Sequence, residues 1–220
     1  MARPVTADGS APGYFGVYPA IVTDIVDPDK LGRIEVRFPW LGTDGDRGVR
    51  AWATLCTPYA DDDQGLQILP SVGTQVTVAF EAGNTDRPYI LGACWNGQEG
   101  LPEAPDQAND IRVWHTRAGS RLEFDDGTPP KVALTMQSGH QVVLDDSAQE
   151  ITIEHGMGCT IRLTATNIEI TANLAVNVTA PMVQVDAPVS TFSGIVQAQT
   201  VVAESFVISP AYTPGLGNLL

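Results

Sequence analysis

Two pairs of adjacent aspartates, Asp125-Asp126 and Asp145-Asp146, are the residues of this chain best suited to catalysis. Clustered carboxylates can hydrolyse glycosidic bonds when one acts as the acid and the other as the base or nucleophile. Each pair, however, follows a short strand-like run, where aspartate commonly accepts a hydrogen bond from the backbone two residues further on. We therefore interpret both pairs as turn residues and predict no catalytic residue. A β-helical carbohydrate-active enzyme is the alternative.

Two further sets of residues could bind an ion or take part in nucleophilic catalysis. The run Asp61-Asp62-Asp63 lacks the alternating D-x-D-x-D-G spacing of a calcium loop, which favours a solvated loop. Ser71 lies in no G-x-S-x-G turn, and the histidines fall on separate predicted strands, which favours structural roles. Histidines stacked near a threefold axis can bind ions, and this stays open for all three. They are His115, His140 and His155. We predict no metal site and no cofactor.

The cysteines indicate a protein without disulfides. The chain has an odd number of cysteines, which lie far apart and show no CxxC spacing: Cys56, Cys94 and Cys159. We therefore expect them to be small hydrophobic residues of the core. The first 13 residues have no apolar signal-peptide core, and no later stretch has the roughly 18 apolar residues of a membrane span. We expect a protein that is assembled in the cytoplasm.

The apolar pattern predicts an all-β chain, because no segment repeats apolar residues at helical spacing and Gly and Pro interrupt it throughout. Residues 13–96 contain five strand-like runs, a number that suits a small closed barrel. The first run is long and contains Gly16 and Pro19, as expected of a strand that bends to pair with two neighbours. The predicted strands are 14–26, 32–38, 49–57, 74–80 and 89–95. Residues 1–12 are assigned to an N-terminal extension.

The charge balance disfavours a nucleic-acid partner. The chain has 26 acidic against 12 basic residues and a net charge of −14, which repels phosphate backbones. The main local basic cluster of the barrel is mixed with acidic residues and is better explained as rim or interface charge. It consists of Arg33, Arg37, Arg47 and Arg50. An oligonucleotide-binding (OB) module remains the alternative.

A linker rich in Pro, Gly and acidic residues, 97–110, separates the barrel from a second all-β region, 111–208. Short alternating runs follow the linker and are joined by turns that contain Gly or Asp. These predicted strands are 111–115, 121–124, 131–136, 141–144, 151–155 and 160–164.

From Asn167 onward the alternation becomes a repeat. Apolar pairs such as Ile168/Ile170, Val176/Val178 and Val183/Val185 recur at steps of seven or eight residues. Each unit has one apolar side but too few large side chains to build a core of its own. Steps of this length cross only one side of a prism, so we predict that three chains wind together and that each chain pairs only with its partners. The second region is thus an intertwined trimeric β-helical needle, and residues 209–220 are a separate tip segment.

Several motifs in this order resemble one known family, the gpV/VgrG-type spike proteins of contractile phage tails, type VI secretion systems and extracellular injection systems. The barrel motifs are 16–22 (GVYPAIV), 27–40 (DPDKLGRIEVRFPW), 69–81 (LPSVGTQVTVAFE) and 86–92 (DRPYILG); those resembling the entry to the family's β-helix are 119–126 (GSRLEFDD) and 138–146 (SGHQVVLDD). Together they cover roughly residues 13 to 190.

The resemblance implies a homotrimeric structural spike that sits in the baseplate of a virion or phage tail-like particle and is not an enzyme. Its N-terminal side would rest on a hub protein, which another chain would supply, and its needle would pierce the target membrane or wall on sheath contraction. Residues 209–220 would dock a PAAR-type tip protein. The chain carries no lysozyme insertion after the barrel, so no cell-wall-degrading activity is transferred from larger relatives.

Overall fold

The computed structural model describes residues 13–44, 47–205 and 208, so the predicted extension 1–12 and tip segment 209–220 lie outside the described residues. The chain consists of strands, and helical backbone within the described ranges is limited to two short 3-10 turns, Pro39–Leu41 and Glu81–Gly83. One compact unit ends at Thr171 and a second begins at Ala172. No helix in the described ranges has the length and apolar character needed to cross a bilayer.

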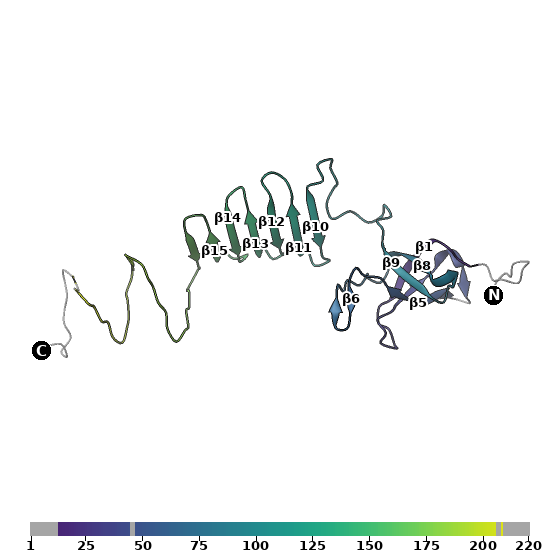
Figure 1. The fold of residues 1–220 in the computed structure, drawn as a ribbon, viewed down its shortest axis with the longest axis horizontal. Coiled ribbons are helices and arrows are strands. Elements are labelled where there is room, and N and C mark those ends of the chain that lie inside the picture. The colour runs from purple at the N-terminus through teal and green to yellow at the C-terminus, as the bar shows by residue number, and fades with distance from the viewer. Residues whose placement is uncertain (1–12, 45–46, 206–207, 209–220) are drawn as a thin grey trace, which may run out of the picture. The chain divides into compact units, whose positions relative to one another are not determined.

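Five strands close into a barrel in the order β1-β2-β5-β9-β8 (Figure 1). Their bounds are β1 Val17–Asp24, β2 Ile34–Arg37, β5 Arg50–Leu55, β8 Gln75–Phe80 and β9 Pro88–Ala93. All neighbouring strands are antiparallel except β5 and β9, which are parallel. Four of the predicted runs contain β1, β2, β5 and β8, the fifth covers β9 except Pro88, and the predicted barrel is confirmed.

The long first strand pairs with both β2 and β8, as its length and interruptions predict. A register shift between Val22 and Asp24 lets it bend, which is how one strand closes a small barrel. Alternate residues point inward and form a core with almost no exposed surface. This core consists of Ala20, Val22, Ile34, Val36, Phe38, Ala53, Val76, Val78, Phe80 and Ile90. The barrel therefore buries its own apolar side chains.

Two small hairpins lie in the loops between the barrel strands. They pair β3 (Thr43–Asp44) with β4 (Arg47–Gly48), and β6 (Ala60–Asp61) with β7 (Gln64–Gly65). The prediction of buried cysteines is wrong for Cys56 and Cys94, which are exposed in the single chain, while Cys159 is half-buried. All three lie at or beyond strand ends, where the alternation that places residues inside or outside no longer applies.

The loop between β1 and β2 is held by one buried carboxylate. Asp27 accepts backbone N–H bonds from Asp29 (3.0 Å), Leu31 (3.0 Å) and Arg33 (3.2 Å). The Arg33 guanidinium donates to both Asp27 oxygens, at 2.8 and 2.9 Å, and lies 5.8 Å from the Trp52 ring centroid. These bonds favour the charged form, and the Arg33 side chain is the largest cause holding the Asp27 pKa far below its usual range.

A second sheet follows the linker and contains seven strands in sequence order, β10 to β16, each antiparallel to the next (Figure 1). Their bounds are β10 Ile111–His115, β11 Arg121–Asp125, β12 Lys131–Thr135, β13 Gln141–Asp145, β14 Glu150–Glu154, β15 Thr160–Leu163 and β16 Ile168–Thr171. The six predicted runs match β10 to β15 to within one residue, and β16 lies in the repeat predicted from Asn167 onward. The prediction that strands after residue 111 pair only with partner chains is wrong up to Thr171, because turns of four or five residues let the chain fold back beside itself.

Residues 172–205 form neither strand nor helix within the single chain, although the alternating apolar pattern continues through them. Their side chains are almost all exposed, including Val176, Val178, Val183 and Val185. A strand-like sequence without a strand partner in its own chain is the expected state of one separated member of an intertwined assembly. The β-helix itself stays a prediction for this segment.

The Asp27 network gives a first testable prediction. The Asp27→Asn variant loses the charge that pairs with Arg33, so its melting temperature should fall clearly, by about 4 °C or more. The matched variant Asp29→Asn removes only the exposed end of the same ion-pair network and should fall much less.

Acid titration supplies the control. Because the folded-state pKa of Asp27 is depressed, its stabilisation is complete above the ordinary aspartate pKa of about 3.9 and is lost as the pH falls towards the folded value. The stability difference between wild type and Asp27→Asn, measured by thermal denaturation, should therefore shrink below about pH 4. Equal differences at pH 7 and pH 2 would contradict this role of Asp27.

Candidate functional site

The sheet β10–β16 has one face that is almost entirely apolar. Side chains alternate between the faces, and the pairing register places like residues side by side across all seven strands. One row on this face is Trp114, Leu122, Leu134, Val142, Ile153, Ile161 and Ile170. The second row is Arg112, Phe124, Val132, Leu144, Ile151, Leu163 and Ile168. Arg112 is the only charged member of this face, which we call the apolar face.

The opposite face, which we call the polar face, is mostly polar and carries ion pairs, although its central row includes Val113, Ala133 and Val143. Arg162 on β15 donates from Nε to Glu150 on β14 at 2.7 Å. Arg121 on β11 binds Glu123 of its own strand and, at 2.7 Å, Glu103 of the linker. These carboxylates raise the pKa values of both guanidinium groups above their usual range. The polar face thus suits water, and Glu103 ties the linker to the sheet.

No described part of the single chain covers the apolar face. Trp114, Phe124, Leu134 and Ile153 are each about half exposed, and Ile168 is 69% exposed. A contiguous apolar surface of this extent on a soluble protein marks a surface for association. Since these side chains are already partly buried by strand neighbours, covering each of them would contribute on the order of 1 kcal/mol. The apolar face is the candidate functional site of this region.

The sheet is built from a repeat of about 20 residues that sequence reasoning missed. β10, β12 and β14 begin at residues 111, 131 and 150, and the turns that follow them place Gly119, Gly139 and Gly158 at positive φ. In each turn this glycine N–H donates to the carbonyl three residues earlier, at 2.7–3.0 Å. Comparing the runs 113–126 and 133–146 side by side would have revealed this period from sequence, including the aligned Asp pairs.

This repeat brings together two histidines for which ion binding was left open, His140 and His155. His140 precedes Gln141 and His155 follows Glu154, and these neighbours pair across β13 and β14. The two imidazole rings lie 4.3 Å apart between centroids. Nδ1 of His140 accepts the Gly156 N–H at 3.1 Å, and Nδ1 of His155 accepts the Met157 N–H at 3.2 Å. In a neutral ring the proton is then on Nε2, so the pair as built offers no free lone pair to a metal.

The aspartate pairs act as turn residues, as the sequence predicts. Asp125 accepts the Gly127 N–H at 2.9 Å, and Asp145 accepts the Ala148 N–H at 3.0 Å. Asp126 lies 3.7 Å from Arg112. A hollow of about 310 Å³ contains Asp145, Asp146 and Glu150, but Glu150 is bound to Arg162. The geometry therefore does not isolate a pair of carboxylates for acid and base roles.

The remaining candidates stay apart. Asp61 accepts the Asp62 N–H at 2.8 Å. Ser71 lies in the loop before β8 of the barrel, whereas the histidines belong to the second sheet and its turns. Within the described residues no three His, Cys, Asp or Glu side chains are grouped to hold a metal. Of the basic cluster, Arg33 and Arg50 are bound to carboxylates, and the side chain of Arg47 is outside the described part. The barrel thus presents no basic groove from these two arginines.

Two family models match the chain, in the same order as the two sheets. The type VI secretion system/phage-baseplate injector OB domain matches residues 18–95, which span the barrel strands. The phage baseplate V C-terminal trimerisation domain matches residues 131–189. The second match covers most of the apolar face and part of the segment without strand partners.

Curated relatives agree with the models. The chain is 29% identical over 102 residues to type VI secretion system spike protein VgrG1a of Pseudomonas aeruginosa, which covers 44% of this chain and 16% of the relative. It is 26% identical over 140 residues to spike protein VgrG3 of Vibrio cholerae, covering 60% of this chain and 14% of the relative. The chain thus corresponds to a small part of these much longer proteins.

The apolar face gives a second prediction, for a single substitution at its centre. Leu134→Glu places a carboxylate where association removes water, which costs several kcal/mol at each of the symmetric sites. Sedimentation velocity at micromolar concentration should show that this variant dissociates or associates at least about tenfold more weakly.

Thr135→Glu is the matched control, because it lies one residue away on the polar face beside Arg121. It should keep the association state of the wild type. If both variants behaved alike, the apolar face would not be the association surface.

Proposed function

We propose that three copies of the chain form the central spike of a contractile injection machine. The chain belongs to the gpV/VgrG-type family of baseplate spike proteins, and it carries the OB domain and the trimerisation domain of that family in order. In this proposal the barrel forms the base of the spike and residues 111–208 form its needle. Sheath contraction drives the spike through the target envelope.

The uncovered apolar face carries the proposal. The trimerisation domain supports association of identical copies, and three sheets that turn their apolar faces inward close a triangular prism with the polar faces outside. The ion pairs of Arg121 and Arg162 then lie on the outer surface, where water surrounds them. A single sheet has no equivalent way to remove its apolar face from solvent.

Residues 172–205 continue the needle in a second manner. Because they have no strand partners among the described residues, their backbone groups need partners from sister copies once water is excluded. The segment after Arg162 contains no Lys or Arg and only three acidic residues, Glu169, Asp186 and Glu204, up to the C-terminal end of the sequence. A rod of this composition carries few charged groups that must be stripped of water when it enters a membrane.

The same proposal assigns the partners. A hub protein contacts the N-terminal side of the barrels, and a PAAR-type tip protein caps the needle through residues 209–220. The trimer is assembled in the cytoplasm and resides in the baseplate of a phage tail or tail-like particle, in keeping with the type VI spike proteins it resembles. Its role is mechanical and requires no catalytic residue, metal or cofactor.

Two measurements test the proposal. Light scattering of the purified chain should give a mass near three times 23.4 kDa, because only association removes the apolar faces from water. Gold-labelled antibody against the chain should mark the baseplate end of injection particles in electron micrographs of the producing cells. A monomeric mass, or a label absent from the particles, would contradict the spike function.

A further inference from the structure

The barrel has one end at which exposed apolar side chains gather. The pairing directions place the loops 25–33 and 56–74 and the exit of β9 at the same end, because β1 ends there, β2 and β8 begin there, and the parallel strands β5 and β9 end there. We call this the exit end, since the chain leaves the barrel from it. Its exposed large apolar residues are Ile25, Val26, Leu31, Tyr59, Leu66, Ile68, Leu69, Val72 and Trp95.

The opposite end differs. In the described parts of its loops, 38–44, 47–49 and 81–87, no large apolar residue is exposed, and the exposed ones at the strand starts are Phe15, Val17 and Tyr89. The barrel core is complete without the exit-end residues, so these side chains are not needed to fold the barrel. Because these side chains gather at one end and are exposed in the single chain, we expect a partner surface to cover them.

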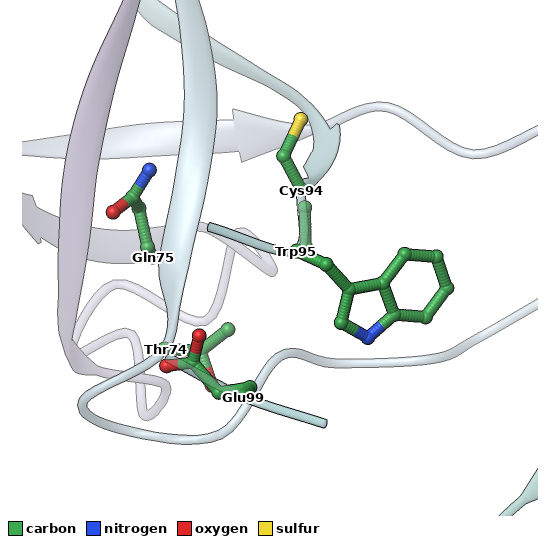
Figure 2. A pocket seen from close by; sticks show the side chains of 6 residues that line it. Thr74, Gln75, Cys94, Trp95 and Glu99 are labelled. Atoms are coloured by element: carbon green, nitrogen blue, oxygen red, sulfur yellow. The ribbon is translucent and has the colours of Figure 1, made fainter. Parts of the chain in front are cut away.

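A groove of about 350 Å³ opens at the exit end between the last residues of β5, the C-terminal half of β9 and the segment 66–70. Its walls include Leu55, Leu66, Leu69 and Leu91, and none of its lining residues is charged. Cys56, which is exposed in the single chain, also lines it. A neighbouring hollow at the β9 exit, formed by Thr74, Gln75, Cys94, Trp95 and Glu99, extends this surface (Figure 2).

The exit end is held in a fixed shape. Asp27 fixes the loop that presents Leu31, through the bonds described above. The 56–74 loop is held by the Thr57 hydroxyl donating to the Leu66 carbonyl at 2.8 Å and by the Leu66 N–H donating to the Tyr59 carbonyl at 2.9 Å. A surface that is ordered before association loses little entropy when it binds.

The linker keeps the exit ends of three copies close together. Glu103 is bound to Arg121 on the sheet, and the Asp126 N–H donates to the Asp110 carbonyl at 2.9 Å, so the connection between barrel and sheet is shortened to about residues 96–102. Seven residues span at most roughly 25 Å. Once the sheets have trimerised, each exit end is therefore at a high effective concentration relative to the other two.

We propose that the three barrels of the trimer pack against one another through their exit ends, each groove closing on apolar side chains of a sister copy. Cyclic threefold symmetry requires each barrel to present two different surfaces to its neighbours, and the exit end offers a concave uncharged groove and the projecting residues Val26 and Leu31. With −14 charges on each chain, copies repel one another except at uncharged surfaces. This inference rests on the proposed trimer and adds the barrel contact to it.

Thiol protection tests this contact in the full chain. In a Cys94→Ser/Cys159→Ser background Cys56 is the only thiol, and its reaction with a maleimide is compared in the native and the guanidinium-unfolded protein. If the exit ends pack together, Cys56 in the native protein should react at least about tenfold more slowly than Cys56 in the unfolded chain. Leu69→Asp, and separately Leu66→Asp, should restore the rate while sedimentation still shows a trimer. Both side chains are about 40% exposed, so the barrel tolerates a polar replacement at either position.

Val17→Asp, an exposed apolar position at the other end of the barrel, is the matched control and should leave Cys56 protected. Near-ultraviolet circular dichroism confirms that each variant keeps its barrel. A trimer in which Cys56 reacts at the unfolded rate would overturn this inference and leave the spike proposal standing, as would protection that persists in both leucine variants. A monomer would overturn both.

Discussion

The structure depends on one constraint: the described part of a single chain leaves the apolar face of its second sheet in contact with water. The seven-stranded sheet β10–β16 satisfies its backbone internally, yet its register aligns Trp114, Leu134, Ile153 and their neighbours on one uncovered side. A sheet becomes stable when that side is packed against another layer. Since the described part of the chain supplies no second layer, this sheet needs a layer from outside that part to complete its packing.

The two sheets meet the same requirement in opposite ways. The barrel closes on itself, so it has no free edge and a complete core, and Asp27 with Arg33 fixes one of its loops at no cost in unpaired buried charge. The second sheet keeps two free edges and an open face. In a spike this difference has an advantage, because the barrel can fold within one chain before the open sheets of three chains associate.

Much of this could be predicted from the sequence, for identifiable reasons. Strand positions follow from period-two alternation and Gly or Asp turns, which are local signals, so β8 and β13 lie where their residues predict them. Pairing partners are not local. The repeat of seven or eight residues after Asn167 does not describe the pairing from residue 111 to residue 171. There a repeat of about 20 residues folds the chain back beside itself. The contact between His140 and His155 depends on that register and was missed with it. Cys56 and Cys94 were misplaced because composition alone does not say which side of a strand end faces solvent.

Hydrogen–deuterium exchange of the backbone amides in residues 172–205 shows whether sister copies pair with this segment, because these residues form no strand with the described part of their own chain. In an intertwined needle, amides in the apolar repeats should exchange as slowly as those of β12 and β13, and this protection should be lost when the trimer dissociates. Exchange at the rate of an unstructured peptide in the native protein would show that no intertwined needle is formed there.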